Sequence, residues 1–203
     1  YELWLRYQPL PEQGAQAWRA RTTQLVLDAG SPTRAAARDE LRRGLQGLLG
    51  RAPAESASPT ADGALSRGRR QASALIRSLD LDLSALGNEG YLIRSQRVNG
   101  RDATLIAANS DLGLLYGSFD LLRRMQTGTL PAQLDVREAP RVKVRVLNHW
   151  DNLDGHVERG YAGTSIWDWW KLPDHRDPRY IDYARANASL GINGTVLNNV
   201  NAN

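Results

Sequence analysis

The fold of this chain is decided by the stretch Val142-Lys143-Val144-Arg145-Val146-Leu147-Asn148-His149-Trp150-Asp151-Asn152. Its valines recur at every second position and alternate with Lys143, Arg145 and Leu147, which is the periodicity of a β-strand. The alternation stops at Asn148, where polar and aromatic residues follow without a break. The stretch therefore predicts a strand whose carboxyl end carries a polar, aromatic cluster.

A helix and a second strand are predicted further along, after a polar, aromatic loop of about 25 residues. Asp177-Pro178 is typical of a helix start, with Asp as the N-cap and Pro at the first helical position, and Gly191 ends the helix. Residues 195–197 form a short apolar run that predicts the second strand. Strand, helix and strand in this order make a βαβ unit, whose two strands pair in parallel.

Both strands of this unit end in clusters of functional residue types. The first runs into His149-Trp150-Asp151-Asn152 and the second into Asn198-Asn199-Val200-Asn201. In parallel α/β folds the functional residues gather at the carboxyl ends of the strands. Parallel sheets are normally covered on both faces, which two strands and one helix do not achieve. We therefore expect residues 136–203 to begin a larger domain, the rest of which belongs to a longer protein or to another chain.

Residues 1–135 predict a small α/β domain with strands on one side and helices packed against them. Three short apolar runs predict strands, at residues 24–27, 91–93 and 104–107. The last two flank Asn99-Gly100, a turn pair that favours a β-hairpin. Two helices are expected, each with a serine cap and a closing glycine, from Ser31 to Gly50 and from Ser110 to Gly128. The small polar residues at 52–63 predict a surface loop or linker.

The composition excludes several classes of protein. The chain has 203 residues, no cysteine, three histidines and 41% apolar residues, which is enough for a core. The lack of cysteine excludes disulfides, thiol nucleophiles and cysteine zinc sites. No apolar stretch approaches the roughly 20 residues of a membrane span, and a net charge of +4 is too dilute to indicate nucleic-acid binding. We expect no metal site, no membrane and no nucleic-acid partner.

The chain begins with Tyr1 in place of methionine. The start is either a processed end, from which a leader has been removed, or a trimmed sequence. On the first interpretation we expect an extracellular or periplasmic protein. The sequence leaves the oligomeric state open and allows a homodimer.

The loop after His149 has the residue types of a sugar-binding site. It holds four of the six tryptophans, Trp150, Trp167, Trp169 and Trp170, together with several carboxylates. An indole face covers the apolar patch of a sugar ring, while carboxylates, amides and guanidinium groups bind its hydroxyls. Trp150 directly follows the strand, so we expect it to face a ligand. For the other three tryptophans we favour packing at the end of a barrel.

Polar residues in this loop each have two interpretations. Asp151 and Glu158 have the chemistry of an acid–base pair for glycoside hydrolysis, which uses two carboxylates. We favour the alternative, in which they bind backbone amides or pair with Arg159 inside a structured loop. His149 is either a proton shuttle or, as we favour, a hydrogen-bonded structural group.

Residues 147–155 (LNHWDNLDG) and 158–163 (ERGYAG) closely resemble the start of the catalytic domain of glycoside hydrolase family 67, the α-glucuronidases of xylan breakdown. The resemblance continues through residues 179–185 and through residues 191–202 (GINGTVLNNVNA). Residues 91–126 look like the N-terminal α/β domain of that family.

The resemblance implies an α/β protein with a small N-terminal α/β sandwich domain, residues 1–135, followed at residues 136–203 by the first βαβ unit of a (β/α)8 barrel. It implies inverting hydrolysis of the α-1,2 bond that joins glucuronic acid, or its 4-O-methyl ether, to xylose in a glucuronoxylo-oligosaccharide (aldouronic acid). No cofactor is expected. In the family the catalytic carboxylates come from later barrel strands, so no catalytic residue is expected here, the isolated chain is expected to be inactive, and the remainder of the barrel becomes a partner.

What the resemblance assigns to this chain is part of the uronic-acid pocket. Trp150 and Val200 would form its apolar wall, and Glu158, Arg159 and Asn199 would make polar contacts. The competing hypothesis is a non-catalytic carbohydrate-binding or assembly module, in which the tryptophans at the strand end bind sugar without chemistry.

Overall fold

A computed structural model describes residues 2–27, 30–128 and 133–197 of the chain. The chain divides into two compact units, Tyr1–Arg141 and Val142–Asn203. Each unit has its own sheet, and each is described here by itself.

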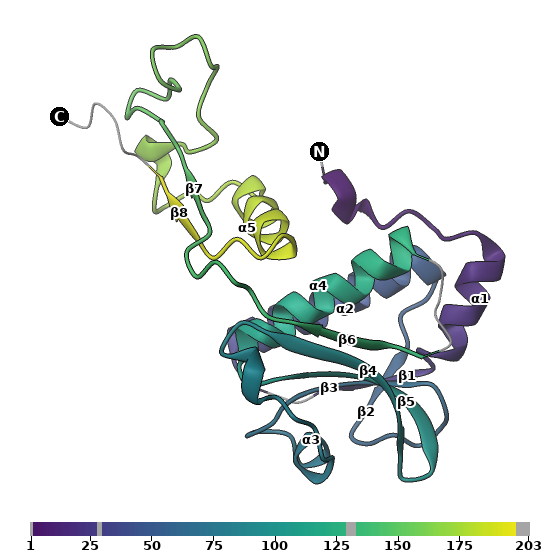
Figure 1. The fold of residues 1–203 in the computed structure, drawn as a ribbon. Helices are drawn as coiled ribbons and strands as arrows, with labels where there is room; N and C mark the ends of the chain where they lie inside the picture. Colours follow the sequence, from purple (N-terminus) through teal and green to yellow (C-terminus); the bar gives the residue numbers. More distant parts are fainter. Residues whose placement is uncertain (1, 28–29, 129–132, 198–203) are drawn as a thin grey trace. The chain divides into compact units, whose positions relative to one another are not determined.

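The first unit is built on a six-stranded mixed sheet (Figure 1). Its strands are β1 (Gln24–Leu27), β2 (Ala54–Ser56), β3 (Ala64–Arg69), β4 (Tyr91–Val98), β5 (Arg101–Ala108) and β6 (Asp135–Glu138). They lie in the order β2-β1-β3-β5-β4-β6, in which β2, β1, β3 and β5 are parallel. β4 pairs antiparallel with both β5 and β6.

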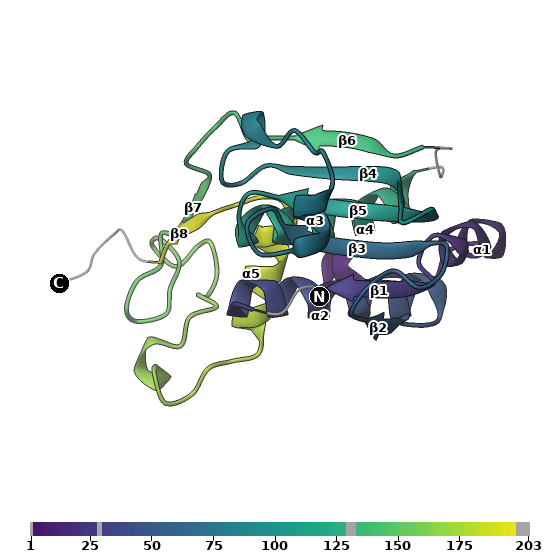
Figure 2. The ribbon, with the colours of Figure 1, turned by 90° about the horizontal axis from the view of Figure 1, so that it is seen from below.

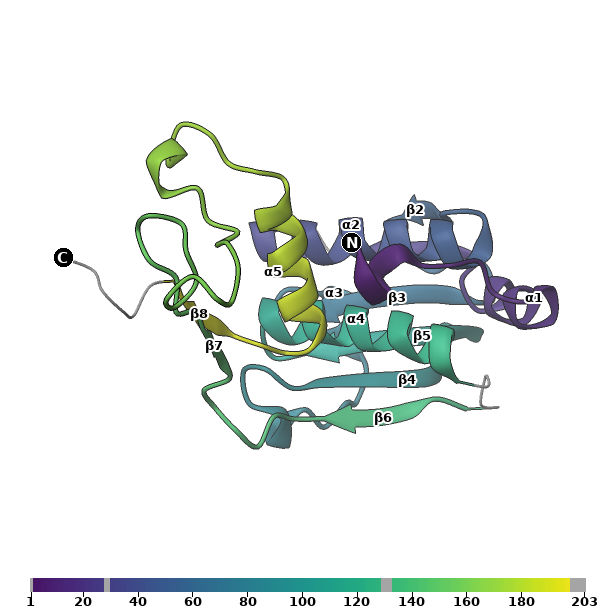
Figure 3. The same cartoon turned by 90° about the horizontal axis from the view of Figure 1, so that it is seen from above.

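Helices cover both faces of this sheet. The helices of the first unit are η1 (Leu3–Arg6), α1 (Glu12–Ala20), α2 (Pro32–Leu49), α3 (Ala74–Ser78), η2 (Ser84–Leu86) and α4 (Asp111–Thr127), where η marks a 3-10 helix. α2 and α4 run side by side over one face (Figure 3), and α3 lies over the other (Figure 2). The expected α/β fold of this part is therefore confirmed.

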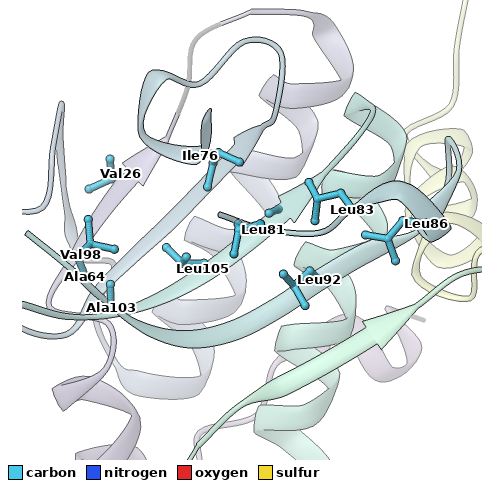
Figure 4. Close-up of a cluster of buried hydrophobic side chains, with 11 residues drawn as sticks. Val26, Ala64, Ile76, Leu81, Leu83, Leu86, Leu92, Val98, Ala103 and Leu105 are labelled. Carbon is cyan, nitrogen blue, oxygen red and sulfur yellow. The ribbon is translucent and has the colours of Figure 1, made fainter. Parts of the chain in front are cut away.

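The buried core follows this layering. Ile76 of α3 packs with Leu81, Leu83 and Leu86 against the strands (Figure 4). The sheet contributes fully or nearly fully buried side chains to the same cluster: Val26, Ala64, Leu92, Val98, Ala103, Leu105 and Ala107. Because these side chains leave water together, they supply the main driving force for this half of the domain.

The local signals in the first unit correctly predicted the ends of α2 and the turn of the hairpin, while β4 and β5 are longer than expected. Ser31 caps α2 by accepting a hydrogen bond from the Arg34 backbone N–H, and Gly50 ends the helix in the left-handed region. Asn99 and Gly100 both have positive φ, 51° and 78°, as the tight turn between β4 and β5 requires. The predicted hairpin is confirmed.

Three strands of the first unit, β2, β3 and β6, were not predicted. The prediction that residues 52–63 are only a loop is wrong, because β2 lies within them and pairs in parallel with β1. β3 lies at the centre of the sheet, but no strand was predicted there, because Arg67 and Arg69 in its second half interrupt the apolar pattern of a buried strand. Arg67 is buried there, and its Nη1 donates to the Arg34 carbonyl oxygen across 3.1 Å.

The second unit is a βαβ unit, as predicted. It contains β7 (Val146–Asn148), η3 (Trp169–Lys171), α5 (Arg179–Ser189) and β8 (Gly194–Val196). β7 and β8 pair in parallel, with Leu147 opposite Thr195. The strand expected to start at Val142 begins only at Val146, and Val142 and Val144 are exposed. α5 begins one residue later than expected, since Pro178 itself is the N-cap.

Candidate functional site

The chain remains extended beyond the end of β7. The His149 backbone N–H donates to the Val196 carbonyl oxygen across 2.9 Å, and Asp151 forms an antiparallel bridge with Val157. Side chains of an extended segment point alternately to opposite sides. His149 and Asp151 therefore share one side, where Asp151 is only 2% exposed, while Trp150 points to the other and is 48% exposed.

A cavity of about 450 Å³ opens at this strand end. It is lined by residues from the end of β7 and from the loop that follows: Asn148, His149, Trp150, Asp151, Val157, Glu158, Ala162, Thr164, Ser165 and Ile166. Its volume falls in the range of small-molecule sites. The wall combines an indole with carboxylates and hydroxyls, and these groups suit a polyhydroxylated ring with one apolar face.

Glu158 is held in an unusual backbone conformation at the cavity wall. Its φ is 52°, in the left-handed region that non-glycine residues seldom occupy. Its N–H donates to the Trp150 carbonyl oxygen across 2.7 Å, and its own carbonyl oxygen accepts from the Asn152 side chain. These two bonds hold the loop in the conformation that brings Glu158 beside Trp150.

A chain of hydrogen bonds connects His149 to the rest of the βαβ unit. His149 Nε2 lies 2.6 Å from the Tyr183 hydroxyl on α5, which lies 2.9 Å from Thr195 Oγ1 on β8. Thr195 in turn donates to the Leu147 carbonyl oxygen across 3.2 Å. The favoured interpretation of His149, a hydrogen-bonded group at a strand end, agrees with this geometry.

Asp151 is a structural carboxylate in this arrangement. Its Oδ1 lies 3.6 Å from His149 Nδ1, and its Oδ2 accepts a hydrogen bond from the Ser165 hydroxyl. Ser165 Oγ also accepts from the Trp167 backbone N–H across 2.9 Å. The carboxylate is therefore held inside a structured loop, as favoured, but its partners are Ser165 and His149, and the expected backbone amides or Arg159 are not among the contacts found.

The other loop tryptophans differ in their environment. Trp167 is buried and packs on Tyr180 with ring centroids 4.8 Å apart, while the rings of Tyr183 and His149 meet it more steeply, at 5.3 and 5.9 Å. This agrees with the packing role favoured for Trp167. Trp170 is 64% exposed and lies against Gly155, where an added Cβ would come within 3.2 Å of the indole.

Two carboxylates of this unit, Asp177 and Asp154, are stabilised as anions. The pKa of Asp177 lies below its ordinary value, because the Arg179 side chain and then the Arg179 backbone N–H hydrogen-bond its carboxylate. The pKa of Asp154 is also lowered, first by the hydrogen bond from the His156 backbone N–H and then by the His156 side chain. The first interaction lies at the start of α5, and the second lies within the loop after β7.

The structure brings together only some of the predicted site residues. Trp150 and Glu158 line the cavity, whereas Arg159 is exposed and does not belong to the lining. Asn199 and Val200 lie outside the described residues, so their predicted place beside Trp150 stays a prediction.

Sequence reasoning missed the partners of His149 and Asp151, which are Tyr183, Thr195 and Ser165. One signal was available: Tyr180 and Tyr183 are three residues apart and thus share a face of α5. Ser165 gives no such signal, because its contact with Asp151 depends on how the loop folds back.

Within residues 2–27, 30–128 and 133–197, no three histidine or carboxylate side chains gather as ligands for a metal ion. Among the same residues, each helix is too short or too polar to cross a bilayer.

The sequence matches two parts of one enzyme family. The pattern described as "Glycosyl hydrolase family 67 N-terminus" matches residues 3–121, and "Glycosyl hydrolase family 67 middle domain" matches residues 124–203. The probable alpha-glucuronidase A of Aspergillus terreus is 34% identical over 98% of this chain and 24% of its own length. Alpha-glucuronidase A of Emericella nidulans is 32% identical over 98% of this chain and 24% of its own length. The chain thus spans about a quarter of the length of these curated relatives.

Solved structures of other glycosidases share the fold. A family GH115 4-O-methyl-α-glucuronidase with specificity for decorated arabinogalactans has a TM-score of 0.58 at 18% identity, over 86% of this chain and 25% of that one. A GH138 enzyme targeting pectin rhamnogalacturonan II has a TM-score of 0.52 at 15% identity, over 85% and 18%. At these identities the likeness concerns the fold alone.

Proposed function

This chain belongs to glycoside hydrolase family 67, and from that membership we propose that it is part of an α-glucuronidase acting on glucuronoxylo-oligosaccharides. The reaction proposed is the inverting hydrolysis of the α-1,2 bond between xylose and glucuronic acid or its 4-O-methyl ether. The observation that carries the proposal is the half-exposed Trp150 indole on the wall of a cavity at the end of β7.

The part of this chain in the reaction is to bind the uronic acid. The Trp150 indole would cover the apolar face of the sugar, with Val200 completing the wall near the 4-O-methyl group. Glu158 is placed to bind a sugar hydroxyl, because it lines the same cavity. Arg159 and Asn199 are proposed as further polar contacts.

The catalytic acid and base are proposed to lie on later strands. Inverting hydrolysis requires one carboxylic acid that protonates the leaving oxygen and one carboxylate that activates water. Asp151 is poorly suited to either role, because it is buried and its oxygens face His149 and Ser165.

Further strands would also cover the second unit. Apolar side chains are exposed on β7, on α5 and on β8: Val146, Leu147, Ile181 and Val196 among them. Burying them against neighbouring strands and helices is favourable, and parallel sheets are normally covered on both faces. We therefore propose residues 136–203 as the start of a (β/α)8 barrel that follows an N-terminal domain at residues 1–135.

The test uses the full-length protein and xylotriose substituted with 4-O-methylglucuronic acid. We expect release of 4-O-methylglucuronic acid, first as the β-anomer in proton NMR, because inversion reverses the α configuration. Release of the α-anomer first would exclude inversion. Binding of the oligosaccharide without release would favour a carbohydrate-binding module. The 203-residue chain alone is expected to release nothing, since the acid and base are proposed to lie elsewhere.

Two further properties of the full-length protein can be tested. Xylan fragments are met outside the cytoplasm, so we propose an extracellular or periplasmic location, which activity assays of cell fractions would test. A homodimer is proposed for the full-length protein, with its mass in solution as the measurement.

A further inference from the structure

We propose that His149 is a positioning residue, which together with Asp151 fixes the direction of the Trp150 indole. The inference rests on the proposed function, because it takes Trp150 as part of the uronic-acid pocket. It extends that function to Tyr183 and Thr195, two residues that do not line the cavity.

Trp150 lies between two anchored neighbours. On one side His149 is held by its backbone bond to Val196 and by its ring bond to Tyr183. On the other side Asp151 is buried and accepts a hydrogen bond from the Ser165 hydroxyl. Since Cβ atoms alternate along an extended segment, fixing both neighbours fixes the direction in which the Trp150 side chain leaves the backbone, at the wall of the cavity that all three residues line.

The hydrogen-bond chain that starts at His149 returns to the strand that carries it. It passes from the His149 ring to Tyr183 on α5, then to Thr195 on β8, and ends on the Leu147 carbonyl oxygen of β7. The chain therefore connects all three elements of the βαβ unit around the residue that precedes Trp150. A displacement of α5 or β8 would be transmitted to His149.

The number of hydrogens available fixes the direction of each bond. A carbonyl oxygen can only accept a hydrogen bond, so Thr195 donates its single hydroxyl hydrogen to the Leu147 carbonyl oxygen. Tyr183 must then donate its own hydrogen to Thr195 and accept one from the imidazole. His149 consequently carries a hydrogen on Nε2.

The second ring nitrogen of His149 faces the buried carboxylate. Nδ1 lies 3.6 Å from Asp151 Oδ1, on the side of the ring opposite the Tyr183 bond. The imidazole is therefore oriented from both sides, and a rotation of the ring would disturb both contacts. Removing the Tyr183 hydroxyl leaves only the Asp151 side of this orientation.

A double-mutant cycle on the full-length enzyme tests the inference. Tyr183→Phe keeps the ring contacts with Trp167 and removes only the hydroxyl. We expect it to lower kcat/KM on 4-O-methylglucuronosyl xylotriose about tenfold, the effect of one lost network hydrogen bond. In the Trp150→Ala background Tyr183→Phe should lower kcat/KM less than about twofold. If Tyr183 acts through Trp150, the effects of the two substitutions are not additive.

Thr195→Val removes the next hydroxyl of the hydrogen-bond chain and should lower kcat/KM as Tyr183→Phe does. With two variants, the inference can still be tested if one of them fails to fold. Tyr180→Phe is the matched control: its hydroxyl accepts from the Asp168 backbone N–H, outside the chain that reaches His149. Equal losses with and without Trp150 would overturn the positioning role. If Trp150→Ala itself changes nothing, the proposed pocket fails instead.

Neutron diffraction of the full-length protein gives an independent readout. We expect a deuterium on His149 Nε2 that points to the Tyr183 oxygen, and the Tyr183 deuterium directed at Thr195. A Tyr183 deuterium directed at Nε2 would reverse the chain and overturn the assignment.

Discussion

The Glu158 backbone N–H donates to the Trp150 carbonyl oxygen across 2.7 Å, which joins two parts of the loop that line the cavity. The bond forms although Glu158 must adopt a left-handed conformation, with φ 52°. Strained residues of this kind persist where the surroundings hold them, and they are frequent at binding sites. The backbone of the proposed sugar-binding wall is thus held independently of any ligand.

Trp150→Ala in the full-length enzyme should weaken transition-state binding of the uronic acid by roughly 1–3 kcal/mol, the scale of one apolar contact in a pocket. The measurement is kcat/KM on the substituted xylotriose. Trp170→Ala is the control, because Trp170 is exposed and does not line the cavity. An unchanged kcat/KM for Trp150→Ala would remove Trp150 from the site.

Glu158→Gly and Glu158→Gln should separate backbone strain from side-chain chemistry. Glycine adopts positive φ without steric cost, so Glu158→Gly should stabilise the loop by up to about 1 kcal/mol while losing affinity for the sugar. Glu158→Gln keeps the conformational strain of a non-glycine residue at positive φ and changes only the charge of the side chain. Urea unfolding and calorimetric titration with 4-O-methylglucuronic acid measure the two effects. Loss of stability in Glu158→Gly would show that its backbone is not strained.

Tyr91→Phe should destabilise the first unit by about 1 kcal/mol, because the Tyr91 hydroxyl hydrogen-bonds the buried Asp120 carboxylate. Asp120 keeps its ion pair with Arg124 Nε at 2.9 Å, so the loss should stay small. Urea unfolding of the 203-residue chain at neutral pH measures it.

The same tyrosine predicts a loss of stability in alkali. Burial, and then the nearby Asp120 charge, raise the pKa of Tyr91 well above its ordinary value. A folded-state pKa above the unfolded one, which is about 10, gives stability that is complete below pH 10 and is lost as the pH rises further. Unfolding curves at pH 9 and pH 11 should therefore differ less for Tyr91→Phe than for the parent chain.

Asp177→Ala should reduce the helicity of the first turn of α5, because Asp177 Oδ1 accepts a hydrogen bond from the Arg179 backbone N–H across 2.9 Å. Asp177→Asn, which keeps an acceptor, should fray it less. The pKa of Asp177 is lowered in the folded state, so this contribution is present at neutral pH and is lost as the pH falls through that lowered value. The amide proton shift of Arg179, followed from pH 6 to pH 2, reports both effects.

Much of the fold was predictable because its determinants are local. Ser31 and Gly50 fix the ends of α2 through the bonding and φ preferences of single residues, and Asn99-Gly100 fixes the hairpin in the same way. β3 escaped prediction because its arginines are tolerated only through tertiary contacts, such as that of Arg67 with the Arg34 carbonyl oxygen.

The site was predictable to the extent that it follows the strand. The position of Trp150 directly after β7 was enough to place it on the cavity. The hydrogen-bond chain of His149 was not predictable, because Tyr183 and Thr195 are distant in the sequence and approach it only when α5 and β8 fold back onto β7.

Exposed apolar side chains lie on the second unit, at Val144 before β7, at Leu147 on β7 and at Ile181 on α5. Its sheet has two short strands, each with an outer edge that has no neighbour among the residues the structure describes. Such edges attract other polypeptides and promote aggregation. Recombinant versions that stop inside the βαβ unit are therefore expected to precipitate more readily than a version cut at Arg141, which retains the whole six-stranded sheet and its buried layers.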